Sequence, residues 1–269
     1  MSQVRPWCDA MWAIIRRDAI LFVSYRSQVV AQFLGPLFTI TLFYYISHLL
    51  TAKTIHSPGG YFGFVIVGLV IVQILTISVG VMPVTVRQEL VSGTIERFLV
   101  SAHGPINGIV GTMLFPLINA IFSGALILGL AAVIFGLPLA TTAVLAIPVG
   151  LLGTIAFMPF AFFLVALVMA FKQAAGATQF IVSGIAIVGG LYFPISVLPW
   201  WIRWASQVQP FTPATDLLRH LIVNTPLVHP AGIELLKLLG FVAVLFPAGV
   251  LLLRSAIRYG QRTGTIVEY

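Results

Sequence analysis

Side chains that could carry out acid–base or metal chemistry are scarce in this sequence of 269 residues, of which only 8% are charged. The five histidines stand at positions 48, 56, 103, 220 and 229, without a spacing typical of metal ligands. None of the lysines follows the glycine of a phosphate-binding G-x-x-x-x-G-K-[ST] loop; they are Lys53, Lys172 and Lys237. These residues predict no metal site and no nucleotide or other cofactor site in this chain.

One group of polar residues is close enough in sequence to be considered for catalysis. Asp216, Arg219 and His220 could serve an integral-membrane enzyme such as a lipid-modifying transferase, which needs clustered polar groups near one face. A capped, charge-paired short helix explains Asp216 and Arg219 more simply. We therefore predict no catalytic residues, and keep the membrane enzyme and a passive channel as alternatives.

The composition indicates a membrane protein. Hydrophobic residues make up 59% of the chain, against about 45–50% in soluble proteins. Residues 98–171 contain no Asp, Glu, Lys or Arg, which is enough for two bilayer crossings at about 20 residues each. The net charge of +7 fits cationic loops beside a membrane better than nucleic-acid binding. We predict a single all-α integral membrane domain over residues 1–269.

Uncharged runs and turn signals predict six transmembrane helices. They cover residues 29–50, 61–86, 106–135, 142–171, 174–194 and 233–253. The long uncharged run divides at Gly136 and Pro138, because this pair favours a turn. With the N-terminus inside, the inner segments hold ten Lys and Arg residues and the outer segments with their flanks hold four. This asymmetry predicts that both termini are cytoplasmic.

Residues 7–25 predict an N-terminal interfacial helix. At about 100° per residue, its apolar side chains fall in one sector and its arginines on the other side. The apolar members are Trp7, Met11, Ile14, Ile15, Phe22 and Tyr25. Such a helix lies along the lipid headgroups. Asp18 interrupts the sector, so a plain anchor and a surface that also touches a cytoplasmic partner both remain open.

Residues 87–104 have helical signals of their own. Gly93 can end the extension of the second span, and Thr94 can cap a short cytoplasmic helix with Glu96 in its first turn. A connector between antiparallel helices needs only a few residues. A structured segment of this length therefore favours a docking element over a spacer.

Residues 195–232 contain too many prolines for an unbroken membrane helix. Tryptophans at positions 200, 201 and 204 beside Arg203 are typical of a belt at headgroup level. Thr212 can then cap a helix with Pro213 at its first position, extending to about Ile222. We predict two short re-entrant helices in the outer leaflet; the alternative is an ordinary outer loop.

The predicted spans offer no obvious source of energy for transport. No Asp or Glu lies well inside a span, and Glu234 and Lys237 stand one turn apart at the start of the sixth. Gln32, Gln73 and Asn119 are typical of polar residues that join helices by hydrogen bonds. Uphill transport would therefore need another subunit to supply the energy.

Two regions of the sequence resemble type-2 ATP-binding-cassette (ABC) exporter permeases. The run Glu89-x-x-x-Gly93-Thr94-x-Glu96 resembles their coupling segment. Their outer re-entrant region resembles Tyr192-Phe193-Pro194-Ile195-x-x-Leu198-Pro199-x-Trp201, followed by Pro210-x-Thr212-Pro213 and Asp216-x-x-Arg219. With the six spans, these motifs cover nearly the whole chain in the order of the family.

The resemblance implies a permease subunit of an ATP-driven exporter. Its substrate would be an amphiphile, such as a drug, a lipid or a lipid-linked glycan, moved out of the cytoplasm or the inner leaflet. The implied partners are two ABC ATPase subunits, which hold ATP and Mg, and a second permease in a bacterial-type cytoplasmic membrane. The residues implied to couple to the ATPase are Glu89, Gly93, Thr94, Glu96, Arg97 and Phe98.

The resemblance also implies a substrate path at the dimer interface, lined by the first and fifth spans. Gln32 and Tyr44 are the candidates on the first span, and Gly189 and Tyr192 those on the fifth. The alternative is that these residues only pack within one subunit.

Overall fold

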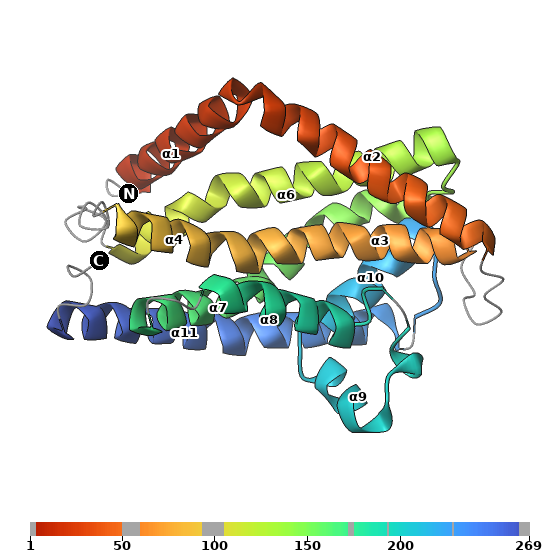
Figure 1. Cartoon of the computed structure of the whole chain (residues 1–269). Coiled ribbons are helices and arrows are strands. Elements are labelled where there is room, and N and C mark those ends of the chain that lie inside the picture. The colour runs from red at the N-terminus through yellow and green to blue at the C-terminus, as the bar shows by residue number, and fades with distance from the viewer. Residues whose placement is uncertain are drawn as a thin grey trace.

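The computed structural model describes residues 4–49, 60–92, 105–171, 175–192, 194–227 and 229–263, and its regular elements are all helices (Figure 1). The helix α1 (Val4–Ser24) begins, and α11 (Ala231–Thr263) ends, at the same end of the bundle, which we call the terminal end. The opposite end, where α2 (Arg26–Leu49) ends and α3 (Gly60–Leu75) begins, is the distal end.

The helix α1 meets α2 at an angle near Tyr25 (Figure 1). It packs against α6 (Pro105–Phe135), where Met11 is buried and its sulfur would lie 3.2 Å from a Cβ added to Gly111. Trp12 and Ile20 are instead exposed. The predicted N-terminal helix is therefore confirmed as a helix, with part of its apolar sector covered by α6.

The second predicted span is part of one continuous helical rod. It consists of α3, the π-helix η1 (Thr76–Val81) and α4 (Met82–Val91). The π turn ends two residues before Pro83, which has no N–H to donate to the carbonyl four residues earlier. Most of the rod is buried by neighbouring helices, whereas α2 is mostly exposed.

The predicted division of the long uncharged run is confirmed. α6 ends at Phe135, and Gly136 follows with a φ of 67°, a conformation that glycine adopts without steric cost. The chain then re-enters the bundle through the 3-10 helix η2 (Thr141–Leu145) and α7 (Ala146–Phe171).

The fifth predicted span is shorter than expected. α8 (Ala175–Val188) has 14 residues, and Gly190 follows it with a φ of 69°. At about 1.5 Å per residue, such a helix is roughly 21 Å long, which is less than the hydrocarbon thickness of about 30 Å. Among the described residues, five helical segments instead of six are long and apolar enough to cross a membrane. They are Val29–His48, Gly60–Gln88, Leu114–Phe135, Thr141–Met169 and Ala231–Gly260.

Short helices follow α8, as the sequence predicts. They are η3 (Ile195–Val197), α9 (Trp200–Gln207) and α10 (Phe211–Val223). The predicted cap at Thr212 is wrong, because α10 begins at Phe211, two residues before the predicted first position Pro213, and the Thr212 hydroxyl donates to the Ser206 carbonyl over 2.6 Å. α10 ends at Asn224, whose φ of 56° closes the helix. α11 has 33 residues and extends beyond the predicted span at both ends.

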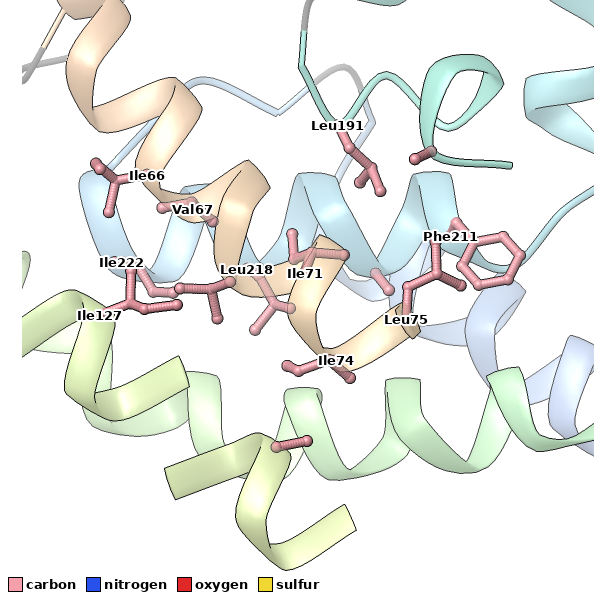
Figure 2. Close-up of a cluster of buried hydrophobic side chains, with 14 of the residues drawn as sticks. Ile66, Val67, Ile71, Ile74, Leu75, Ile127, Leu191, Phe211, Leu218 and Ile222 are labelled. Carbon is pink, nitrogen blue, oxygen red and sulfur yellow. The ribbon is translucent and has the colours of Figure 1, made fainter. Parts of the chain in front are cut away.

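Two buried clusters hold the helices together. The larger surrounds α3 and α10, where Ile71, Leu75 and Phe211 are in contact with residues from α6 and α7 (Figure 2). The second lies toward the terminal end, where Met82 and Leu90 of α4 share a cluster with Phe162 of α7, and α7 in turn packs against α11. Burial of these side chains stabilises the bundle's interior, and leaves much of α2 and α11 exposed.

Candidate functional site

The predicted coupling segment begins where α4 ends. Ser92 closes this helix, with its backbone N–H donating to the Gln88 carbonyl over 2.9 Å and its hydroxyl donating to the same oxygen over 2.8 Å. Arg87 is exposed on the last turns. Met82 and Leu90 of the same helix belong to the second buried cluster. A displacement of this helix end would therefore be transmitted to α7 and α11.

Arg219 ties the end of α8 to α10. Its Nη1 donates to the Gly190 carbonyl over 3.0 Å, and its Nη2 donates to the Leu191 carbonyl over 2.9 Å. The guanidinium carbon lies 3.5 Å from the centre of the Phe64 ring of α3. The side chain is 4% exposed. These contacts compensate for the water that a cation loses when it is buried.

Burial shifts the pKa of both Asp216 and Arg219. Burial raises the pKa of Asp216, and the positive charge of Arg219 opposes that shift. Burial lowers the pKa of Arg219 to about 9. Arg219 therefore remains positively charged at neutral pH. Both residues belong to α10, which is not one of the five candidate spans.

The chain after α8 runs very close to α3. A Cβ added to Gly68 would collide with the backbone carbonyl oxygen of Leu191. A Cβ added to Gly189 would lie 3.3 Å from the Gln209 Nε2 and 2.9 Å from the Ile185 carbonyl oxygen. Glycine is required at position 68 for this approach, which brings the Leu191 carbonyl within reach of Arg219.

A polar contact joins α2 to α6. The Gln32 side-chain amide donates to the Asn119 Oδ1 over 2.9 Å and to the Ser123 hydroxyl over 2.6 Å. It borders a cavity of about 350 Å³ between α2, α3 and α6, which Gln73 and Thr39 also line. The cavity has the size of a small polar solute or several waters.

Tyr44 lies in an aromatic cluster toward the end of α2. Its ring centre is 4.5 Å from that of His48, 5.5 Å from that of Phe62 and 4.9 Å from that of Phe135. These spacings are typical of stabilising aromatic pairs. The cluster links α2, α3 and α6 near the distal end.

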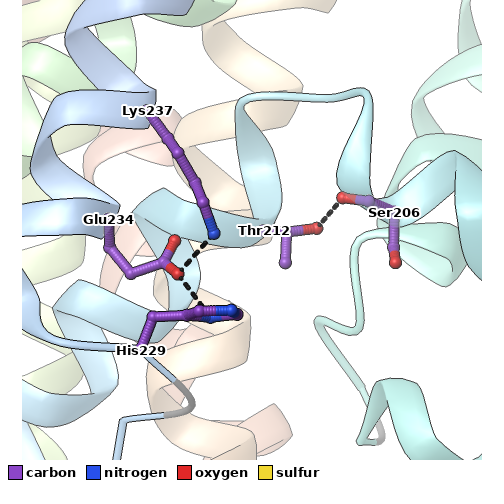
Figure 3. Close-up of polar contacts among 5 residues, drawn as sticks. All are labelled: Ser206, Thr212, His229, Glu234 and Lys237. Atoms are coloured by element: carbon purple, nitrogen blue, oxygen red, sulfur yellow. Dashed lines mark hydrogen bonds and ion pairs between the residues drawn. The ribbon is translucent and has the colours of Figure 1, made fainter.

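A larger pocket of about 880 Å³ opens between α9, α10 and α11, and we call it the distal pocket. Lys237 Nζ and His229 Nδ1 both approach Glu234 Oε1, at 2.8 and 3.0 Å (Figure 3). Asp216 and Arg203 also line it. Within the described part of the chain, no three or more His, Cys, Asp or Glu residues are grouped so as to hold a metal ion.

Comparison with known proteins identifies the family. The model of the ABC-2 type transporter family matches residues 9–223, from α1 through α10. The chain belongs to the ABC-2 type transporter family. It is thus a multi-pass membrane permease subunit of an ABC transporter. No curated protein matches the chain.

The residues predicted to couple this ABC permease to an ATPase are mostly beyond what the structure describes. Gly93, Thr94, Glu96, Arg97 and Phe98 lie outside the described residues, and so does the side chain of Glu89. The coupling role stays a prediction.

The predicted path residues of the permease do not form one site within the chain. Gln32 and Tyr44 belong to α2, which packs against α1, α3 and α6. Gly189 and Tyr192 follow α8, which packs against η1, α4, α7 and α9. Both α2 residues contact neighbours inside the subunit, and the role of all four in transport stays a prediction.

Some of the permease's polar contacts follow from the sequence and others do not. The predicted pairing of Glu234 with Lys237 is confirmed, as is the role of Gln32 and Asn119 in joining helices. The contribution of His229 was missed. The expected charge pair of Arg219 with Asp216 is wrong, because the guanidinium donates instead to the Gly190 and Leu191 carbonyls. A cation within the largely apolar α10 was the available signal for a buried contact.

Proposed function

We propose that this permease is the membrane subunit of an ATP-driven exporter of amphiphiles, such as drugs, lipids or lipid-linked glycans. The observation that carries the proposal is the family match over residues 9–223. The sequence also has no phosphate-binding loop of its own. ATP and Mg²⁺ would be bound by a separate pair of ABC ATPase subunits.

The coupling segment 87–104 is the proposed contact with the ATPase. Glu89, Glu96 and Arg97 supply charges, Phe98 an apolar anchor, and Gly93 with Thr94 the turn into a short helix. The continuous rod from α3 to α4 supports this role, because movement at one end of an unbroken helix is transmitted along it.

A second permease, either another copy or a close paralogue, would complete the path. The interface would involve α2 and α8, with Gln32, Tyr44, Gly189 and Tyr192 near the substrate. The large exposed apolar side chains of α2 support a lipid- or partner-facing surface: Phe38 is 79% exposed. We place the complex in a bacterial-type cytoplasmic membrane with both termini in the cytoplasm, as the Lys and Arg distribution favours.

The test is a double charge reversal, Glu96→Lys with Arg97→Glu, in permease co-expressed with its ATPase. We expect ATPase co-purification and substrate-stimulated ATP hydrolysis to fall about tenfold, since reversed charges repel their former partners. Membrane insertion should remain normal.

The matched control for charge at the terminal end is the single reversal Arg258→Glu on α11, where Arg258 is exposed. Arg258→Glu should retain ATPase binding, whereas the single reversal Arg97→Glu should weaken it. Unchanged co-purification and hydrolysis in the double variant would show that the ATPase docks elsewhere.

A further inference from the structure

The polar end of the distal pocket contains two carboxylates, of which one contacts basic side chains and the other does not. Glu234 is 3% exposed, and its Oε1 lies 2.8 Å from the Lys237 Nζ and 3.0 Å from the His229 Nδ1. Asp216 makes no hydrogen bond or salt bridge with the other described residues. The nearest cation in its helix, Arg219, donates to the Gly190 and Leu191 carbonyls. One carboxylate of the pocket therefore retains its capacity to accept hydrogen bonds from a ligand.

Positive charge also lines the same pocket. Arg203 of α9 lines it, with its Nη2 donating to the Leu198 carbonyl over 2.9 Å. Lys237 of α11 is 43% exposed while it contacts Glu234. A ligand that carries one ammonium and one phosphate would match this arrangement, because each charge finds an opposite charge in the pocket.

The other end of the pocket is apolar. Phe241, Val244 and Leu245 of α11 form this wall. From Glu234 to Leu245 the helix advances by roughly 16 Å at about 1.5 Å per residue, which accommodates much of an acyl chain. Val244 is 69% exposed, so the wall continues onto the open face of α11. An acyl chain could thus enter from the surrounding lipid.

The tryptophans of α9 indicate the depth of the polar end. Trp200, Trp201 and Trp204 are 83%, 60% and 65% exposed. Exposed tryptophans in a membrane protein gather where hydrocarbon meets headgroups. Arg203 belongs to the same helix, so the charged end of the pocket is placed beside lipid headgroups and the apolar wall beside their chains.

We propose that the distal pocket binds a zwitterionic phospholipid with a primary ammonium group, of the phosphatidylethanolamine type. The ammonium donates to the Asp216 carboxylate, the phosphate lies between Arg203 and Lys237, and one acyl chain follows Phe241 and Val244. A quaternary ammonium has no N–H to donate to Asp216, and an anionic headgroup would place negative charge against it. This lipid site is independent of what the permease exports.

The experiment measures binding to the full-length permease purified in detergent without its ATPase. Short-chain phosphatidylethanolamine, phosphatidylcholine and phosphatidylglycerol are titrated separately, and retained lipid is counted by native mass spectrometry. We expect phosphatidylethanolamine to bind about tenfold more tightly than the other two, the change expected for one charge-assisted contact. Glycerophosphoethanolamine, which has the headgroup and no chains, should bind much more weakly.

Two variants locate the lipid. Asp216→Asn should abolish the preference for phosphatidylethanolamine, and Asp216→Glu should restore part of it. Val244→Trp should fill the apolar wall and lower binding about tenfold through steric exclusion. Its matched control is Leu236→Trp on the same helix, because Leu236 is 70% exposed and does not line the pocket.

Equal binding of the three lipids, or an unchanged preference in Asp216→Asn, would overturn the ammonium contact. Equal loss in Val244→Trp and Leu236→Trp, or tight binding of the chain-free headgroup, would overturn the lipid assignment. None of these outcomes bears on ATPase coupling, because no ATPase is present in the experiment.

Discussion

The distal part of the bundle combines apolar packing with charge-assisted hydrogen bonds, whereas the second buried cluster consists of apolar side chains. Toward the terminal end, α7 packs against both α4 and α11 through apolar side chains, including Met82, Met158 and Met169. Toward the distal end, the chain after α8 is held by charge-assisted hydrogen bonds from Arg219. Apolar contacts have no fixed direction and methionine adapts to new neighbours, whereas hydrogen bonds require defined distances and angles. The difference favours a distal region with one arrangement and a terminal region that repacks when α4 moves.

The largest expected effect comes from removing the distal clamp, by which we mean the hydrogen bonds from Arg219 to the Gly190 and Leu191 carbonyls. In Arg219→Met, the Gly190 and Leu191 carbonyls lose their donors, and the free energy of unfolding should fall by about 3 kcal/mol. Arg219→Lys should recover only part of this loss, because an ammonium lacks the planar fork that reaches two carbonyls. Denaturant unfolding of the purified permease in detergent measures the change.

The matched control for this prediction is Arg203→Met, since Arg203 is an exposed arginine on the neighbouring α9. Its loss should cost less than about 1 kcal/mol in lipid-free detergent. An equal loss of unfolding free energy in Arg219→Met and Arg203→Met would contradict the view that the distal clamp stabilises this region more than an exposed arginine does.

A smaller effect is expected at the polar contact between α2 and α6. In Gln32→Leu, Asn119 and Ser123 lose a partner, but the adjoining cavity of about 350 Å³ can admit water to them. The free energy of unfolding should fall by about 1 kcal/mol, near the usual value for a hydrogen bond between membrane helices. A loss as large as that of Arg219→Met would show that rigid polar contacts extend beyond the distal end. The neighbouring exposed residue Phe33 supplies a control as Phe33→Leu.

The smallest effect is expected within the terminal cluster. Met82 is fully buried, yet Met82→Leu nearly conserves volume, and the unfolding free energy should change by less than about 1 kcal/mol. Unfolding measurements on the same preparation test this directly. A loss of unfolding free energy greater than that of Gln32→Leu would contradict the view that this cluster repacks easily. The variant Met158→Leu, in the same cluster, checks that the result is not particular to one position.

Local patterns in the sequence were sufficient for much of the fold. The turn after Phe135 follows from Gly136 and Pro138, and the pairing of Glu234 with Lys237 follows from helical spacing. The early end of α8 was not predicted, although Gly189 and Gly190 follow this helix and a glycine pair favours a turn. The carbonyls that the end of α8 leaves without helical partners bond to Arg219, which lies 28 residues beyond Leu191 in the sequence. No local pattern encodes such a partner.

The candidate site was predicted to a similar depth. The sequence identified the polar side chain of Gln32 and its tendency to join helices, and Asn119 among the groups of this kind. It gave no indication of the distal pocket, which is assembled from three helices and depends on how α9 and α10 pack against α11. Residues distant in sequence become a site only through that packing.

The π-helical turn in the middle of the rod has a consequence for the orientation of the end of α4, where the predicted coupling segment begins. A π turn holds one residue more than an α turn, so everything beyond Thr76–Val81 is rotated about the helix axis by about 100° relative to an uninterrupted α-helix. Met82, Val86 and Leu90 face their cluster in this rotated phase. Deleting one residue from the π turn would therefore rotate the end of α4 about the helix axis, while the sequence of the coupling segment stays intact.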